Sequence, residues 1–161
     1  MNQKSLAIIT ARGGSKRIPR KNIKDFCGKP IMAYSIEAAL EAGCFDTVMV
    51  STDDEEIAQI AKKYGAEVPF LRSERTAGDF ATTADVMMEV FEEYEKRGEK
   101  FDHAACIYPT APFVTAQKLK AGMSLLQEKQ GTMLMPVVAF SFPPQRGVVK
   151  KGEFLEFCYP Q

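Results

Sequence analysis

The sequence predicts a three-layer α/β sandwich with a mainly parallel sheet, and three observations support this. Apolar segments of strand length alternate with segments whose apolar residues recur at helical spacing. The length of 161 residues, of which 45% are hydrophobic, suffices for a single core. A glycine-rich basic loop directly follows the first apolar segment. Right-handed crossovers would bring the strand ends together at one edge of the sheet, where such folds bind ligands.

Five short apolar segments are predicted as strands, because they are bounded by polar or turn-forming residues. They are Leu6–Thr10, Thr47–Ser51, Glu67–Phe70, Ala104–Tyr108 and Thr132–Val138. Their spacing leaves room for crossover helices, as parallel neighbours require.

The first two helices have recognisable ends. Pro30 suits the first turn of a helix, and Gly43 suits its end. Asp53 or Asp54 can cap the second helix, which runs toward Gly65. Asp53 could instead hold Mg²⁺, but capping is the commoner role for a carboxylate here, so we leave it out of any metal site.

Two further helices are predicted downstream. Thr82 or Thr83 begins the third helix, and Gly98 ends it. Thr115 begins the fourth. After Val138 the pattern changes to a proline-containing loop and a hairpin. We therefore predict one domain over residues 1–161, with residues 139–161 starting a protruding hairpin or dimerisation region.

Composition and charge narrow the class of protein. The net charge is zero, yet the first 24 residues contain seven Lys or Arg and no Asp or Glu. This asymmetry favours a local anion site over a nucleic-acid surface, which would need a broader basic face. No apolar stretch is long enough for a membrane span and no secretory signal is visible, so we expect a cytoplasmic protein. The four cysteines are widely spaced and read as reduced thiols.

The basic loop spans residues 11–22 and has the features of a phosphate site. It contains no carboxylate and five cations, namely Arg12, Lys16, Arg17, Arg20 and Lys21. Gly13 and Gly14 are expected to take positive φ and let the backbone approach a ligand, with free N–H groups that bind an anion. The loop matches neither the Walker A nor the dinucleotide-binding glycine pattern.

Residues 8–23 closely resemble the N-terminal signature of the acylneuraminate cytidylyltransferases. Shorter matches follow in the same order at residues 26–31, 50–53, 70–72, 79–83 and 108–112. Within this family, the chain is most similar to the pseudaminic acid cytidylyltransferase branch, because Tyr108 stands where the sialic acid branch usually carries Gln. The resemblance implies a Rossmann-like nucleotidyltransferase sheet.

The resemblance also implies roles for single residues. Lys16 and Lys21 would act on the phosphates as catalytic cations. The nucleotide would be bound by Arg12, Gly13, Gly14, Ser15, Asn22, Arg72, Ala81 and Thr83. Tyr108 would meet the sugar acid, although burial in the core is an equally good interpretation. For Arg17 and Arg20, ligand binding and simple solvation stay open, and Thr82 and Thr83 could merely cap their helix.

The reaction implied is attack of a sugar-acid hydroxyl on the α-phosphate of CTP, with release of pyrophosphate. The family uses Mg²⁺, held by a late Asp-x-Asp motif, and no such motif follows Phe140. The metal ligands are therefore unknown, and the chain is expected to be truncated after about two-thirds of the enzyme. A full-length homodimer is expected, with no nucleic-acid or membrane partner. Another sugar nucleotidyltransferase and an inactive nucleotide-binding fragment are the alternatives.

Overall fold

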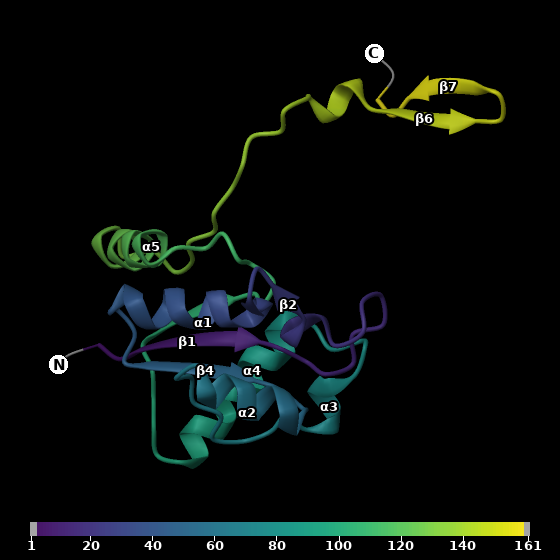
Figure 1. Ribbon diagram of the computed structural model, residues 1–161. Helices are drawn as coiled ribbons and strands as arrows, with labels where there is room; N and C mark the ends of the chain where they lie inside the picture. Colours follow the sequence, from purple (N-terminus) through teal and green to yellow (C-terminus); the bar gives the residue numbers. More distant parts are fainter. Residues whose placement is uncertain (1–2, 160–161) are drawn as a thin grey trace. The chain divides into compact units, whose positions relative to one another are not determined.

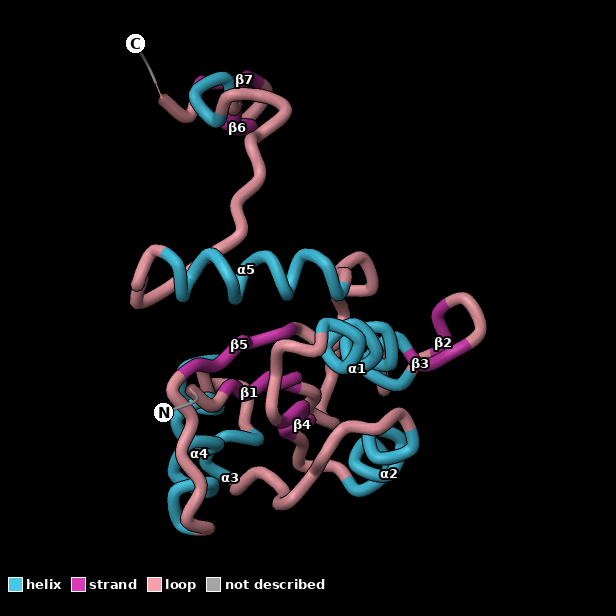
Figure 2. Tube along the Cα trace, turned by 90° about the vertical axis from the view of Figure 1, so that its left-hand side faces the viewer, coloured by secondary structure: helices cyan, strands magenta, loops and turns pink. Residues whose placement is uncertain are grey.

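The computed structural model describes residues 3–159, and the chain forms two compact units, Met1–Gln130 and Gly131–Gln161. In the first unit, β1 (Ser5–Thr10) lies between β4 (Thr47–Ser51) and β5 (His103–Ile107), and both neighbours are parallel to it. Figure 1 labels β1 and β4, and Figure 2 labels all three strands. The mixed α/β architecture with a parallel central sheet is thus confirmed. The assignment of the whole chain to one domain stays a prediction.

Helices cover both faces of this sheet, as Figure 2 shows. One face packs against α1 (Ile31–Ala42), α2 (Glu55–Lys63) and part of α5 (Ala116–Glu128). The other face packs against α4 (Thr83–Lys96). The central strand is completely buried from Leu6 to Ile9. Each such aliphatic side chain contributes about 1.5–3 kcal/mol relative to exposure, so β1 anchors the loop that follows it.

The helix ends agree closely with the capping residues of the sequence. Helix α1 begins directly after Pro30 and ends at Gly43, whose φ of 60° is the left-handed conformation that glycine adopts without strain. Helix α2 is capped by Asp54, whose carboxylate accepts from the Ile57 N–H at 3.0 Å. Asp53 therefore does not cap this helix, and its carboxylate is available for another partner.

The later helices also start at threonines. Thr82 and Asp85 form a reciprocal capping box at the start of α4, and Thr115 caps α5. Since Thr82 provides the cap, the hydroxyl of Thr83 is not used for that purpose. This distinction matters for the site described below.

Two predicted strands are wrong or incomplete. Residues 67–70 form only an isolated bridge, between Met49 and Glu67. Residues 132–138 have no regular structure, and Met133 and Val138 are 73% and 92% exposed. Strand pairing must satisfy the backbone polar groups, and within residues 131–159 the strands at 148–151 and 154–157 pair with each other. An apolar strand-like pattern alone does not supply that partner.

Short elements complete the two units. Those not foreseen are η1 (Lys21–Ile23), β2 (Asp25–Phe26), β3 (Lys29–Pro30), α3 (Glu74–Ala77) and η2 (Pro144–Arg146). The predicted hairpin is present in the second unit, where β6 (Val148–Lys151) and β7 (Phe154–Phe157) pair antiparallel. Among the described residues, none of the helices combines the length and the apolar character that crossing a bilayer demands.

Candidate functional site

A cavity of about 330 Å³ opens at the carboxyl ends of β1 and β5. Its lining comes from the basic loop, from residues 72–86 and from residues 108–110. Nine of the eleven predicted site residues line it, namely Arg12, Ser15, Lys16, Lys21, Asn22, Arg72, Ala81, Thr83 and Tyr108. The fold thus brings together side chains that lie up to 96 residues apart (108 minus 12). Their individual roles stay predictions.

Gly13 and Gly14 do not line the cavity, and the expected positive φ is wrong for both. A Cβ on Gly13 would lie 2.8 Å from Asp54 Oδ2 and 2.9 Å from Asp54 Cβ, whereas a Cβ on Gly14 would meet nothing within 4 Å. Gly13 is therefore required because the start of α2 approaches it closely. Its N–H donates to Asp53 Oδ1 at 2.8 Å, so that group is already paired and is not a free anion donor.

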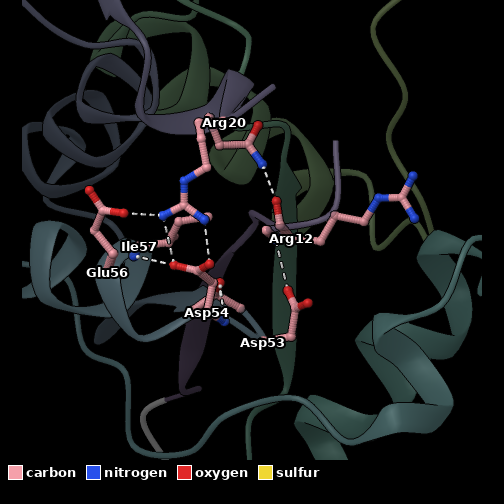
Figure 3. Close-up of polar contacts among 9 residues, drawn as sticks. Arg12, Arg20, Asp53, Asp54, Glu56 and Ile57 are labelled. Atoms are coloured by element: carbon pink, nitrogen blue, oxygen red, sulfur yellow. Dashed lines mark hydrogen bonds and ion pairs between the residues drawn. The ribbon is translucent and has the colours of Figure 1, made fainter. Parts of the chain in front are cut away.

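Arg20 is a structural anchor of the loop. Figure 3 shows its guanidinium between the carboxylates of Asp54 and Glu56, and both are hydrogen-bonded ion pairs. A second bond to Asp54, from Nη2 to Oδ1, measures 3.0 Å. The hydrogen bond from Arg20 is the largest of the effects that hold the pKa of the Asp54 carboxyl below its usual range. Of the two arginines left open by the sequence, only Arg17 lines the cavity.

Asn22 fixes the main chain of the loop from inside. Its side chain is buried, and Nδ2 donates to the Arg12 carbonyl at 2.8 Å. The other amide atom, Oδ1, is buried without a hydrogen-bond partner among the described residues. Buried acceptors are normally paired, so the Oδ1 atom of this cavity-lining residue is an unsatisfied acceptor.

Arg72 is the most buried cation of the site. Its Nε donates to Ser51 Oγ at 2.7 Å and Nη2 donates to the Ser51 carbonyl at 2.8 Å. Burial lowers the pKa of Arg72 to about 10, and this value still leaves the guanidinium charged at neutral pH. The end of β4 thus holds a fixed, partly desolvated positive charge at the wall of the cavity.

The basic loop is also tied to the loop before α4. Arg12 Nη1 donates to Asp79 Oδ1 at 2.9 Å and to the Gly78 carbonyl at 3.3 Å. Lys16 pairs with the other carboxylate oxygen of Asp79. Figure 3 shows the Arg12 side chain directed away from the Asp53–Asp54 cluster. Arg12 and Lys16 therefore meet on the cavity side of the loop.

Tyr108 and Thr83 lie together at the far wall of the cavity. Their hydroxyl oxygens are 3.4 Å apart, and the Tyr108 carbonyl accepts from Ser35 Oγ at 2.9 Å. Tyr108 is 58% exposed, so the interpretation of it as a core residue is wrong. A main chain held by α1 with an open ring and hydroxyl is suited to contacting a ligand.

Three functional features were missed by sequence reasoning. Asp79 belongs to a matched motif but had no assigned role, and its contacts lie more than 60 residues away. The sequence indicated Ser51 only as the last residue of a strand, although its hydroxyl accepts a hydrogen bond from Arg72. Glu89 is buried in α4, accepts from the Ser73 N–H at 3.1 Å and from Thr76, and so fixes α3 beside Arg72. A polar residue at an inward helical position was the signal for Glu89.

Other reactive groups play no part in this cavity. All four cysteines are free, and burial raises the pKa of the Cys44 and Cys106 thiols. His103 is at the start of β5, where its Nε2 is 3.2 Å from Gln3 Oε1. Within residues 3–159, no three His, Cys, Asp or Glu side chains are grouped as a metal site would need.

A parallel α/β sheet with a basic loop at the end of its first strand is typical of phosphate-binding α/β proteins. The family model described as cytidylyltransferase matches residues 6–146. The chain therefore belongs to the cytidylyltransferase family. This agrees with the resemblance stated from the motifs.

Curated relatives give the same family. The chain is 46% identical over 143 residues to the pseudaminic acid cytidylyltransferase of Campylobacter jejuni, covering 89% of this chain and 62% of that protein. It is 33% identical to the CMP-N,N'-diacetyllegionaminic acid synthase of Legionella pneumophila, covering 94% of this chain and 66% of that protein. The chain thus spans somewhat under two-thirds of the length of the Campylobacter protein.

A solved structure confirms the fold. The CMP:2-keto-3-deoxy-manno-octonic acid synthetase complexed with CTP superposes with a TM-score of 0.67 over 79% of this chain and 48% of that chain. Its sequence is 24% identical, so this likeness concerns the fold alone.

Proposed function

We propose that this chain binds CTP in the cavity and belongs to an enzyme that transfers CMP to a nine-carbon sugar acid. The observation that carries the proposal is the convergence of Arg12, Lys16, Lys21 and Arg72 on one cavity at the sheet edge. With Arg17, five cations line this open space, and such a cluster matches a polyanionic ligand. The names of the relatives in Campylobacter and Legionella support cytidylyl transfer to such an acid.

The cations of the loop are assigned to the triphosphate. Lys16 and Lys21 act as mobile point charges, and the planar fork of Arg12 can bind two phosphate oxygens at once. Ser15 adds a hydroxyl at the same wall. The Gly13 N–H is paired with Asp53, so Gly13 contributes through the path of the main chain, whereas a ligand contact by Gly14 stays a prediction.

The nucleoside is assigned to Ala81, Thr83 and the Asn22 side chain, which also line the cavity. Ala81 leaves room for a pyrimidine ring, and the Thr83 hydroxyl can bond its polar edge. Asn22 Oδ1 is an acceptor, so it suits a ribose hydroxyl, which donates, better than a phosphate oxygen, which does not. Arg72 places positive charge between the two regions.

The proposed reaction relies on position and charge. A hydroxyl of the sugar acid attacks the α-phosphorus, and the bond to the bridging oxygen of pyrophosphate breaks. Fixed cations stabilise the negative charge that develops on the phosphate oxygens, and no covalent enzyme intermediate is needed.

For the acceptor we favour pseudaminic acid over sialic acid. Tyr108 offers an aromatic face and one hydroxyl, which suits a substrate with deoxy and N-acyl groups. The identity of 46% to the Campylobacter pseudaminic acid cytidylyltransferase supports the same choice. Faster turnover of sialic acid by the full-length enzyme would reject it.

The described residues do not fit a magnesium site by themselves. Mg²⁺ requires several oxygen ligands in octahedral geometry. Of the carboxylates near the loop, Asp79 is paired with two cations and Asp53 accepts from Gly13. We therefore derive no step through the metal. The use of Mg²⁺, homodimer formation and a cytoplasmic location stay predictions.

Two alternatives are separated by experiment. Calorimetric titration with CTP, UTP, GTP and ATP separates a cytidylyltransferase from an enzyme for another sugar nucleotide, and we expect CTP to bind tightest. Formation of a CMP-sugar from CTP and candidate acids separates an enzyme from an inactive binding fragment. Equal binding of all four nucleotides would contradict the proposed function.

A further inference from the structure

Asp79 forms ion pairs with two of the cations that the proposed function assigns to the phosphates. One carboxylate oxygen bonds Arg12 and the other faces Lys16, so the group bridges the two cations. Hydrogen bonds from Lys16 and then Arg12 are the main causes that hold the pKa of the Asp79 carboxyl below its usual value. Asp79 is therefore ionised at neutral pH and presents to the loop what a phosphate would present, two anionic oxygens.

These ion pairs are open to exchange. The side chains of Arg12, Lys16 and Asp79 are 35%, 79% and 39% exposed. Exposed ion pairs contribute little net stability, because water screens them and the side chains lose freedom. A polyphosphate carries several negative charges and can replace a single carboxylate on the same cations.

We propose that Asp79 is an intramolecular competitor of the nucleotide's phosphates for Arg12 and Lys16. This rests on the proposed function in assigning the ligand, although the competition concerns any polyphosphate. In the free protein Asp79 holds the two cations together. When phosphates bind, Asp79 leaves, and when pyrophosphate departs, the carboxylate returns to its place.

The exchange reaches the nucleoside wall of the cavity. Asp79 and Gly78 precede Ala81 and Thr83 by only a few residues, and both of the earlier residues are bonded to Arg12. Release of Asp79 therefore frees the segment that carries the proposed base contacts. Phosphate binding and the position of residues 78–82 are thus coupled through one side chain.

The test compares Asp79→Asn with wild type in calorimetric titrations with inorganic pyrophosphate and with CTP at fixed ionic strength. If the competing pair is closed for most of the time, its removal tightens the apparent affinity by about three- to tenfold. Glu74→Gln is the matched control. Glu74 is an exposed carboxylate of α3 that has no side-chain hydrogen bond or ion pair to residues 3–159, and its removal should change affinity less than twofold.

A second measurement needs no variant. The backbone amide NMR signals of residues 78–82 in wild type should shift when pyrophosphate is added, because Asp79 then leaves Arg12 and Lys16. Unchanged or weaker binding by Asp79→Asn, or unshifted signals of this segment in pyrophosphate-bound wild type, overturns the proposal. If Asp79→Asn binds pyrophosphate more tightly than wild type but CTP is not preferred over other nucleotides, the competition is supported. Only the assignment of the nucleoside is then rejected. Failure of wild type and variant to bind pyrophosphate rejects both.

Discussion

The guanidinium of Arg72 is bonded to Ser51 at two points, through Nε to Oγ at 2.7 Å and through Nη2 to the carbonyl at 2.8 Å. The same carbonyl accepts from the N–H of Ala11, the first residue of the basic loop, at 2.9 Å. Ser51, at the end of β4, therefore connects the start of the loop with a half-buried arginine. This arrangement fixes the direction of the arginine without neutralising its charge.

Arg72→Lys tests whether that charge acts on the nucleotide. Burial lowers the pKa of Arg72 to about 10. The same desolvation on a lysine, which starts from a lower value, brings its pKa closer to neutral pH than the pKa of Arg72. CTP affinity of the variant should therefore fall as pH rises from 7 to 9, while wild type stays constant. Calorimetry across this pH range measures the CTP affinity of both proteins. An affinity of the variant that does not change with pH would show that the charge of residue 72 does not act on the nucleotide.

Gly13→Ala should destabilise the protein, and Gly14→Ala should not. The new Cβ at residue 13 overlaps Asp54, whereas the one at residue 14 meets open space. Forced overpacking costs about 1–3 kcal/mol. Urea unfolding followed by circular dichroism compares the two variants. Equal stability of both would show that the loop shifts freely away from α2.

Asp54→Asn separates the ion pair with Arg20 from the helix cap, since asparagine caps as well as aspartate does. We expect the free energy of unfolding to fall by about 1 kcal/mol at pH 7, a small amount because the ion pair is partly exposed. The pKa of folded Asp54 lies below its unfolded value. Its stabilisation is therefore complete above about pH 4 and disappears as pH falls through the folded pKa.

Unfolding experiments from pH 7 down to below pH 4 measure the free energy of unfolding of both proteins. The difference in this free energy between wild type and Asp54→Asn should shrink at the acid end. Glu41→Gln, at an exposed residue near the end of α1, is the control for loss of one charge. A difference that is constant with pH would rule out the ion pair as its cause.

Lys16→Ala should weaken the binding of CTP by about 1.5–3 kcal/mol, the range for hydrogen bonds to charged groups. Lys24→Ala is the matched control, because Lys24 is exposed and does not line the cavity. Calorimetry at one salt concentration measures both. Unchanged CTP affinity of Lys16→Ala would contradict the assignment of the triphosphate to this loop.

Local signals in the sequence determined much of the first unit. Apolar runs located three parallel strands, and capping residues such as Asp54, Thr82 and Thr115 located three helix starts. The predicted site residues came from the motifs that resemble the cytidylyltransferases, and nine of them line one cavity. The strands and helix starts depend on periodicity and capping, which a single sequence contains.

Features that depend on distant partners could not be predicted in this way. Gly13 is needed because Asp54, more than 40 residues away, approaches it, and no local pattern records that distance. Asp79 carries no sign that it pairs with the basic loop. Residues 132–138 have the composition of a strand, but a strand also requires a neighbour.

The hairpin of the second unit should promote association of the chain. The cross-strand pairs Val148–Phe157 and Lys150–Leu155 place three apolar side chains on one face, and Leu155 and Phe157 are 70% and 64% exposed. A two-stranded hairpin is only marginally stable by itself, so burial against a second copy would stabilise it. Light scattering after size exclusion should show dimers or larger species at tens of micromolar, and Leu155→Ser with Phe157→Ser should shift them toward monomer. Glu153→Gln in the exposed turn should leave the distribution unchanged. A strictly monomeric wild type, or dimers that survive both serine substitutions, would place association elsewhere.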